Sequence, residues 1–579
     1  MGVFILAVGP GRADAARRAD AALVAGGLAL AALIETVDFR LSVFRKLNGE
    51  GGTFVSCGDG DFACCTGTLI KNGLIGAEAL AALWAEFDPD DLDPWKNTQG
   101  HWCAVLRKRG RVHVINDRLN VNKIYHDGTL TVLSNAFVAL CEMGRPGAPN
   151  RQGCYEYVWN GVPFGTKTLF DAIVSLPNNA VTTLEGGRVQ VRNRASAYTP
   201  QPMERVELDD IADVYNARLR GLFRLYARHW PRQVSSALSG GYDSRLLLAL
   251  LHDAGMEPSL FVYGAEESSD VRVAKAVSAG EGLALRHIDK AEHPRVSPSD
   301  YAALMARNVI AFDGWKTDGL FDGGADLDDR RARSANGQAL MNGSVGEIFR
   351  NFYYMRDTAY SLRDVVWTFY SRYDPAACTE AFSPRRYEDN VIAEIAQAVG
   401  LPNSGRVPRP SVEMIYPLFR GRYWTARDTA INQRFGTALY PYLEPSVFDG
   451  TWDIPLDLKN FGRLEGRMIQ RLSPSLASHT SNYGFDFTGP VPWRYRVKMT
   501  LNSCRPPWMR RLSYRHQWRR MGPMPYFLGP DYLSMVIDTS FPFMRQLFRV
   551  DRVHDAEAFN RLCTVEYLCQ RYGAALDIL

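Results

Sequence analysis

The sequence lacks the features that mark several protein classes. Its net charge is only +4 over 579 residues, which argues against a dedicated nucleic-acid binder, because such proteins usually carry a basic face or a strongly basic domain. Low-complexity tracts and internal repeats are absent. The longest apolar run, Ala21 to Ile34, is shorter than the roughly 20 residues that a membrane-spanning helix needs. We interpret this run as a packed helix and expect a cytoplasmic protein with no membrane partner; a signal peptide or anchor is the alternative.

The cysteines also exclude certain sites. They form no C-x-x-C pair, so the ligand spacing typical of zinc sites is missing. Scattered thiols fit a cytosolic enzyme better than a secreted protein held by disulfides. The ten cysteines are Cys57, Cys64, Cys65, Cys103, Cys141, Cys154, Cys378, Cys504, Cys563 and Cys569.

What the sequence does contain is typical of a large globular protein. Apolar residues make up 46% and charged residues 22% of a chain too long for one hydrophobic core, so we expect at least two domains. Short strand-like runs bounded by turn residues fill the first 200 residues, and the polar segment Arg192–Glu204 predicts a linker. The predicted strands are Thr53–Ser56, Trp102–Arg107, Val112–Ile115, Thr129–Leu133 and Ala180–Leu184, with a helix over Ala77–Phe87.

After the linker, strands alternate with helices. An amphipathic helix over Asp210–Trp230 precedes an apolar strand, Gln233–Leu238. The alternation that follows predicts a parallel, doubly wound sheet, and the remainder from Asp300 reads as mostly helical. The alternating elements are the helix Arg245–Ala254, the strand Ser259–Gly264, the helix Ser269–Ala279 and the strand Ala284–Ile288.

The segment Ser239–Ser244, with the sequence SGGYDS, is the sharpest chemical signal. It lies between the first predicted strand of the sheet and a helix, and its two glycines allow a tight turn close to a ligand. Free amides at the start of a helix attract an anion, two serines add hydroxyl groups, and Asp243 is suited to hold Mg²⁺ against phosphate oxygens. The loop lacks the lysine of a Walker A sequence, which argues against γ-phosphate transfer. The alternative is an ordinary glycine-rich turn.

This loop, together with Ala237 and Leu238 before it, resembles the pyrophosphate loop of N-type ATP pyrophosphatases, most closely that of the asparagine synthetase superfamily. Two further segments resemble that family: Phe261–Gly264 with Ser269–Asp270, where adenine contacts are made, and Met341–Phe349, a second loop near phosphate and Mg²⁺. Arg427–Glu444 resembles the segment that closes its acceptor pocket. The resemblance implies ATP and Mg²⁺ as cofactors. It implies ATP contacts from Ala237, Leu238, Ser239, Gly240, Gly241, Tyr242, Asp243, Ser244, Tyr263, Asp270, Gly343 and Ser344, and metal contacts from Asp243 and Glu347.

The N-terminal half is similar to the glutaminase domain of the same family, through Trp102–Val105, Asn116–Asn120 and Leu133–Asn135. The resemblance implies an α/β protein with two domains. Residues 1–200 would form a degenerate αββα domain of the N-terminal-nucleophile hydrolase type, and residues 205–579 a doubly wound ATP-pyrophosphatase domain with a helical extension. A working glutaminase of this family needs a cysteine after the initiator methionine, and this chain has Gly2 there. We therefore expect a scaffold or docking domain; Cys57 as a relocated nucleophile is the alternative to a structural cysteine.

Family members that lost this cysteine resemble lasso-peptide cyclases and β-lactam synthetases. Both adenylate a carboxylate and let an amine of the same molecule attack it, which makes the second step intramolecular. The resemblance implies an AMP-forming ligase, with macrolactam closure of a precursor peptide as the leading reaction. Partners would then be the precursor peptide, a leader-binding protein and a leader peptidase. A β-lactam synthetase, or an amide ligase for another small carboxylate, is the alternative.

Two departures from the family pattern concern the chemistry. The family usually has an aspartate where this chain has Gly346, one residue before Glu347. A catalytic lysine is missing from Ser478–Phe485; in the family it stabilises charge on the reacting phosphate. His479 and Arg434 are the replacements that we predict, with the arginines near the C-terminus as further candidates. An inactive ATP-binding scaffold is the alternative of another class.

The stretch Arg505–Arg520 combines arginines with aromatic residues. Such a surface is suited to an extended, partly acidic peptide, and a solvated basic face is the alternative. Thiolation of nucleic acid is disfavoured, because paired catalytic cysteines and a basic domain are missing.

Overall fold

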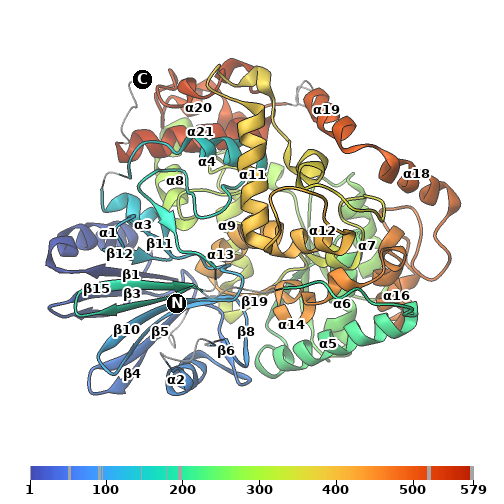
Figure 1. Cartoon of the computed structure of the whole chain (residues 1–579), viewed down its shortest axis with the longest axis horizontal. Helices are drawn as coiled ribbons and strands as arrows, with labels where there is room; N and C mark the ends of the chain where they lie inside the picture. Colours follow the sequence, from blue (N-terminus) through green and yellow to red (C-terminus); the bar gives the residue numbers. More distant parts are fainter. Residues whose placement is uncertain are drawn as a thin grey trace.

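The computed structural model describes residues 2–49, 54–88, 93, 95–144, 146–178, 180–193, 198–517 and 523–573. An N-terminal β-rich half and a C-terminal half of helices around a parallel sheet lie side by side (Figure 1). The fold class is α/β.

Two antiparallel six-stranded sheets form the N-terminal half. Their strand orders are β13-β11-β12-β1-β3-β2 and β15-β14-β10-β9-β5-β4. The first sheet contains β1 (Val3–Val8), β2 (Leu30–Glu35), β3 (Phe39–Phe44), β11 (Tyr125–His126), β12 (Val132–Ser134) and β13 (Val174–Ser175). The second contains β4 (Phe54–Gly58), β5 (Asp61–Gly67), β9 (Trp102–Lys108), β10 (Arg111–Asn116), β14 (Ala180–Glu185) and β15 (Arg188–Asn193).

Strand periodicity arranges these sheets in four layers. The even-numbered side chains of β1 pack against the second sheet, while its odd-numbered side chains join the core that contains the buried face of helix α1 (Ala13–Ala25). On the second sheet, Cys64 and Val105 face the first sheet, whereas Cys65 and Ala104 face helix α2 (Gly76–Glu86). Alternation places successive side chains on opposite faces, so each sheet is buried on both sides. The predicted αββα arrangement is confirmed.

One predicted element is wrong. The apolar run Ala21–Ile34 is not a single helix, because α1 ends at Ala25 and β2 begins at Leu30. Gly26 and Gly27 separate the two elements, and Gly27 has a φ of 96°, a conformation that glycine adopts without strain. The run therefore contributes a helix end and a strand of the first sheet.

The C-terminal half is built on a five-stranded parallel sheet with the order β18-β17-β16-β19-β20. The chain enters in the middle at β16, winds out to β18, and returns to add β19 and β20 on the other side of β16. This confirms the doubly wound sheet and places the point where the winding reverses between β16 and β19. The strands are β16 (Val234–Ala237), β17 (Pro258–Tyr263), β18 (Leu285–Ile288), β19 (Ala339–Met341) and β20 (Thr437–Leu439), with helices α5 (Leu208–His229), α6 (Tyr242–Asp253) and α7 (Ser269–Gly280).

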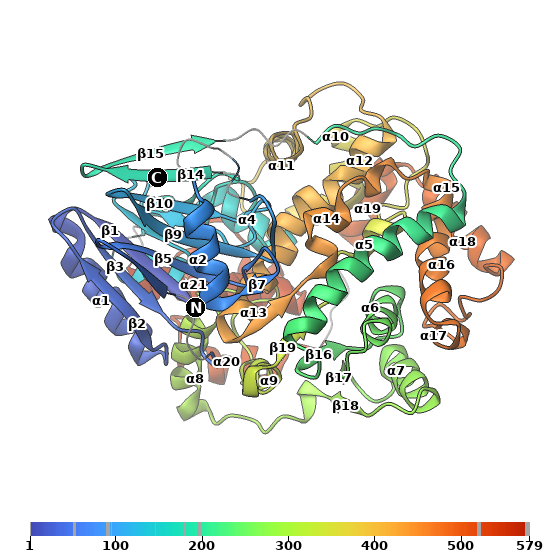
Figure 2. The same ribbon diagram turned by 90° about the horizontal axis from the view of Figure 1, so that it is seen from below.

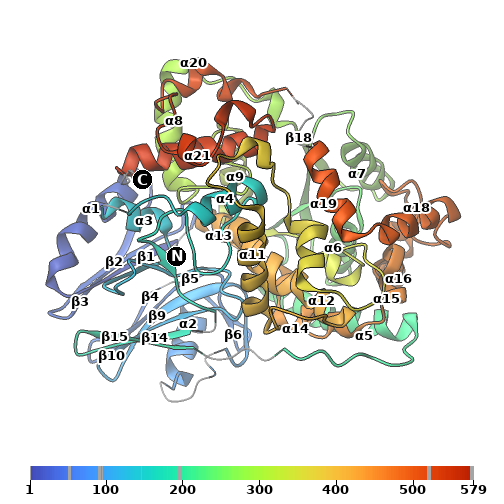
Figure 3. The ribbon, with the colours of Figure 1, turned by 45° about the horizontal axis from the view of Figure 1, so that its top comes forward.

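Further helices cover this sheet and extend back to the N-terminal half. Helix α21 lies beside α4 (Arg151–Asn160), which belongs to the N-terminal half (Figure 3). One continuous apolar core contains residues from both halves, such as Val3 and Leu562. The principal helices are α8 (Pro298–Ala311), α9 (Ala325–Arg333), α11 (Pro384–Val399), α12 (Arg409–Ile415), α13 (Ala426–Phe435), α16 (Arg463–Leu472), α18 (Trp493–Cys504), α19 (Pro507–Gln517) and α21 (Ala556–Tyr572).

Within the described ranges, none of the helices combines the length and the apolar character that a bilayer crossing requires. The ten cysteines are all free thiols, and Cys57 lies on the edge strand β4, where its Sγ faces the carbonyl oxygen of Val55 at 3.8 Å. Burial and the nearby Asp61 raise the pKa of this thiol above its usual value.

Candidate functional site

Two loops meet where the winding of the parallel sheet reverses. One joins β16 to α6 and contains Ser239–Gly241; the other follows β19 and contains Asn342–Val345. The second loop lies against the start of α6, since a β-carbon added to Gly343 would lie 3.5 Å from the carbonyl carbon of Asp243. The carboxyl ends of parallel strands on either side of such a reversal form a crevice, which is where ligands bind in open α/β sheets.

The first loop is held together by its own side chains. The Ser239 amide donates to Oγ of Ser244 at 2.9 Å, and the two serine hydroxyls are 3.0 Å apart. The Gly240 amide donates to Oδ1 of Asp270 at 3.0 Å, so this loop already binds an oxyanion from its own chain. Helix α6 begins at Tyr242 without a side-chain cap, which leaves its first amides available to an anion.

Asn482 covers one side of the loop. Its amide donates to the Gly240 carbonyl at 3.0 Å, and its side chain donates to Asp270 at 3.1 Å. A β-carbon on Gly240 would lie 2.8 Å from that of Asn482, so glycine is needed for this approach. The structure thus brings Asp270, predicted from the resemblance, to the loop, together with a residue that the sequence analysis did not single out.

Three carboxylates surround one guanidinium at the start of α6. Arg350 pairs with Oδ2 of Asp243 at 2.6 Å and with Oε2 of Glu465 at 2.8 Å, and it lies 3.9 Å from Glu347. The Glu465 side chain is completely buried, whereas Glu347 keeps a third of its side-chain surface exposed. The Tyr416 hydroxyl donates to Glu347. Asp243 and Glu347, the two predicted metal ligands, therefore lie in one cluster.

Burial sets the charge state of this cluster. It raises the pKa of Asp243 to about 6, a rise that Arg350 opposes and Glu347 strengthens. Burial and the charge of Asp243 raise the pKa of Glu465 well above its usual value. Glu465 is thus the group that keeps its proton, which it shares with Asp243, while Asp243 is ionised at neutral pH.

The donor chemistry of the cluster fits a magnesium ion. Mg²⁺ commonly takes one or two protein carboxylates and completes its shell with phosphate oxygens and water. Asp243 pairs with Arg350 at 2.6 Å, and Glu347 lies 3.9 Å from the same guanidinium, so the two carboxylates are close enough to serve one ion. Among the described residues no group of three or more His, Cys, Asp or Glu side chains is arranged to hold a metal ion by itself.

A cavity of about 500 Å³ opens beside the cluster. Tyr242, Glu347 and Arg350 form its inner wall, and α18 and α19 form part of its outer wall. Arg372 and Arg505 also line it, and neither has a carboxylate within ion-pair distance in the described part of the chain. A volume of this size accepts a small ligand or a peptide segment. Its remaining lining is rich in tyrosine: Tyr353, Tyr354, Tyr483, Tyr495 and Tyr514.

The Arg505–Arg520 stretch is divided between several roles. Arg505 lines the cavity, Arg510 donates to the carbonyls of Tyr353 and Tyr354, and Arg511 pairs with Glu388 at 2.8 Å. Trp508 is 53% exposed. Residues 518–520 of this stretch lie outside the described residues, as does any contact of their side chains.

The two replacements predicted for the missing lysine lie elsewhere. The His479 imidazole pairs with Glu281 at 2.8 Å, at the end of α7 opposite to Asp270; twelve helical residues separate these ends by roughly 16 Å. The Arg434 side chain is buried at the junction of the two halves, where it donates to the Ile310 carbonyl at 2.8 Å and faces Asp313. Neither side chain contacts the loop.

The other predicted residues line the same sheet edge. Tyr263 ends the strand next to β16, and its hydroxyl donates to Asp329. Ala237 pairs with Phe261, and the Leu238 amide donates to the Phe261 carbonyl at 2.8 Å. The Ser344 amide donates to Oδ1 of Asn342 at 2.8 Å. In the segment predicted to close the acceptor pocket, the Tyr442 hydroxyl reaches the Asp243 carbonyl at 3.2 Å.

The sequence analysis missed Arg350, Glu465 and Tyr483. Arg350 follows Glu347 by three residues, a spacing that places both on one side of a helical turn, so it was open to prediction. Tyr483 accepts from Arg350 at 3.1 Å and lies in the Ser478–Phe485 stretch, where His479 was the residue predicted to act. Glu465 comes from α16, far along the chain, and no local pattern distinguishes it from an ordinary helix residue.

Comparison with protein-family models and with curated proteins gives no match to this sequence. Two solved structures align with the fold at 9% identity and a TM-score of 0.24. One is described as the allosteric regulatory enzyme of purine biosynthesis. Its alignment covers 50% of this chain and 80% of that chain. The other is glutamine phosphoribosylpyrophosphate amidotransferase from B. subtilis, complexed with ADP and GMP. Its alignment covers 59% of this chain and 82% of that chain. At this TM-score neither likeness carries an argument about function.

Proposed function

We propose that this protein is an ATP-dependent ligase that adenylates a carboxylate, releases pyrophosphate, and joins the acyl group to an amine with release of AMP. The observation that carries the proposal is the position of the Ser239–Ser244 loop at the reversal of the sheet, where Asp243 pairs with Arg350 and Arg350 lines a cavity of substrate size. A loop without the Walker A lysine favours departure of pyrophosphate over transfer of the γ-phosphate.

In the proposed reaction, the uncapped start of α6 and the serine hydroxyls bind the β- and γ-phosphates of ATP. The Asp270 carboxylate that now accepts from Gly240 has to move aside, because a phosphate oxygen would take the same amide. Asp243 and Glu347 would hold Mg²⁺, which supplies charge screening for the departing pyrophosphate.

Arg350 takes the role of the missing lysine. Its guanidinium lies between the loop and the cavity, where negative charge develops as the substrate carboxylate attacks the α-phosphate. Asp243 and Glu465 fix its orientation from one side, and Tyr483 does so from another. A preorganised cation in a largely buried site stabilises such charge better than a mobile surface lysine would.

The cavity favours an anionic substrate with an extended body. Arg372 and Arg505 offer uncompensated positive charge, and the tyrosines offer hydrogen bonds and flat apolar contacts. A precursor peptide that closes an acidic side chain onto its own amine is the leading substrate class. A small amino carboxylate, as in β-lactam formation, is the second candidate, favoured by the limited volume of about 500 Å³.

Product analysis tests the proposal. The protein is incubated with Mg²⁺, ATP labelled at the α-phosphate, and a panel of acidic peptides and small amino carboxylates. We expect AMP and pyrophosphate with at least one panel member, and none with Asp243→Asn. Asp253→Asn, at the other end of the same helix, is the matched control and should remain active. ADP as the nucleotide product, or AMP formation unchanged by Asp243→Asn, would refute the proposal.

A further inference from the structure

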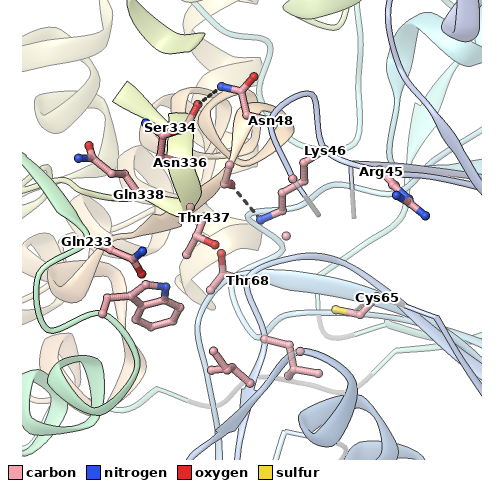
Figure 4. Close-up of a pocket in the computed structure, with 18 of the residues that line it drawn as sticks. Arg45, Lys46, Asn48, Cys65, Thr68, Gln233, Ser334, Asn336, Gln338 and Thr437 are labelled. Atoms are coloured by element: carbon pink, nitrogen blue, oxygen red, sulfur yellow. Dashed lines mark hydrogen bonds between the residues drawn. The ribbon is translucent and has the colours of Figure 1, made fainter. Parts of the chain in front are cut away.

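A second cavity, of about 600 Å³, lies between the two halves of the molecule (Figure 4). From the C-terminal half, it is lined by Gln233, Gln338 and Thr437, which stand at the amino ends of β16, β19 and β20. The Ser239–Ser244 loop stands at the carboxyl end of β16. Four residues at about 3.3 Å each separate the two ends, so this junction cavity is distinct from the candidate active site.

Lys46 brings positive charge to the junction cavity. Arg45 is also a lining residue, but its side chain is directed away from this space (Figure 4), and the lining residues that the structure describes include neither aspartate nor glutamate. Helix α2 begins at Gly76, which also lines the cavity, and it has no side-chain cap, so its first amides are free to meet an anion. Glu78, in the same turn of α2, does not line the cavity.

The cavity also presents polar groups that lack partners. Thr68 is 6% exposed, and its buried hydroxyl has no hydrogen-bond partner in the described chain. Figure 4 shows Lys46, Thr68 and Thr437 directed toward a common space between the two halves. Among the described residues the Lys46 amine has one hydrogen-bond partner, the Gly436 carbonyl at 2.9 Å, and burial lowers the pKa of Lys46 to about 8. An ammonium group so poorly compensated is stabilised by any anion that reaches it.

From these observations we propose that the junction cavity binds a small polar metabolite through its carboxylate or phosphate group. Lys46 and the first amides of α2 would hold the anionic group, and Thr68 would donate its hydroxyl. The carboxamides of Gln233 and Gln338 would bind the rest of the molecule from the other half. Because the ligand would contact both halves, its binding would stabilise the junction between them. The ligand would also contact the amino ends of the strands that lead to both candidate loops, so its binding would affect the positions of those loops.

Isothermal titration at constant ionic strength tests this proposal, with inorganic phosphate and citrate as separate probes for the two anionic groups. At least one probe should bind the wild-type protein. Lys46→Met should weaken that binding at least about tenfold, because it removes a charge-assisted hydrogen bond. Thr68→Val, which loses only an unpartnered hydroxyl and should fold normally, should weaken it about threefold or more.

Ser244→Ala is the matched control, because it changes the other anion-binding loop and leaves the junction cavity intact. Binding that survives in Ser244→Ala and is lost in the Lys46 and Thr68 variants supports the proposal. The proposal is overturned if neither probe binds the wild-type protein. It is also overturned if binding persists in Thr68→Val and Lys46→Met, or if binding is lost in Ser244→Ala instead. Circular dichroism of each variant identifies any loss of fold.

Discussion

Gly346 stands directly against the side chain of Asp243: a β-carbon added to Gly346 would lie 2.0 Å from Oδ1 of Asp243. No side chain fits at position 346 while Asp243 keeps its place at the start of α6. The family pattern, which has an aspartate here, is therefore incompatible with the Asp243–Arg350 ion pair of this chain. Val345, just before it, has a φ of 75°, a strained conformation for a branched residue, which indicates that the loop is held in a defined shape.

Gly346→Ala should accordingly displace Asp243 and reduce AMP formation about 100-fold, since it disturbs both the proposed metal ligand and the partner of Arg350. Gly221→Ala on α5 is the control, because a β-carbon there would meet no atom within 4 Å. The measurement is the rate of AMP release at saturating ATP. Equal activity of the two variants would show that the Asp243 position is unimportant.

Arg350→Ala should lower the rate of AMP formation by about 10²–10³, the range found when one preorganised donor to a developing charge is removed. Arg350→Lys should recover part of this loss, because an ammonium restores the charge but not the two-sided pairing with Asp243 and Glu465.

His479→Ala should stay within about twofold of the wild-type rate, since its partially exposed pair with Glu281 lies apart from the loop. Single-turnover rates of the His479 and Arg350 variants, compared side by side, assign the lysine's role. A large loss in His479→Ala together with an active Arg350→Ala would reverse that assignment.

Activity should depend on the ionisation of Asp243. Its pKa is raised to about 6 by burial, and the ionised form is the one that pairs with Arg350 and could bind a metal. Activity should therefore be full above this value and fall as the pH is lowered through about 6. The pH profile of kcat at saturating substrate measures this. An acid limb near pH 4, where an unperturbed aspartate titrates, would contradict the role of burial.

Arg372 and Arg505, which form no ion pair with a described residue, should govern substrate binding rather than chemistry. Replacing both, as Arg372→Gln with Arg505→Gln, should raise KM for an acidic substrate about tenfold or more and change kcat about threefold at most. Arg385→Gln, whose side chain is 89% exposed, is the control for loss of positive charge. A fall in kcat with an unchanged KM would move these arginines into the catalytic step.

The first three strands of the parallel sheet and the Ser239–Ser244 loop could be predicted from the sequence, because they depend on local signals. The β16 strand, the glycine pair and helix α6 follow one another within 20 residues, and periodicity with turn chemistry is sufficient to identify them. Strands β19 and β20 are only three residues long, too short for a period to appear, although they complete the sheet. Figure 2 shows β19 next to β16.

The partners of Asp243 in the candidate site depend on tertiary packing instead. Glu465 reaches Asp243 from a helix more than 200 residues later in the chain. The sequence does not show that the His479 side chain points to Glu281 and away from the loop. The long apolar run was misread for a related reason, since composition hides the break that Gly26 and Gly27 introduce.

Transfer of oxygen from substrate to nucleotide tests the central claim most directly. A panel carboxylate that supports turnover is labelled with ¹⁸O at its carboxyl group, and the nucleotide product is analysed by mass spectrometry. Adenylation predicts one ¹⁸O atom in AMP. The attacking carboxylate oxygen becomes bonded to the α-phosphate and leaves with AMP when the amine attacks the acyl carbon. Unlabelled AMP, or a label found in phosphate alongside ADP, would contradict the account.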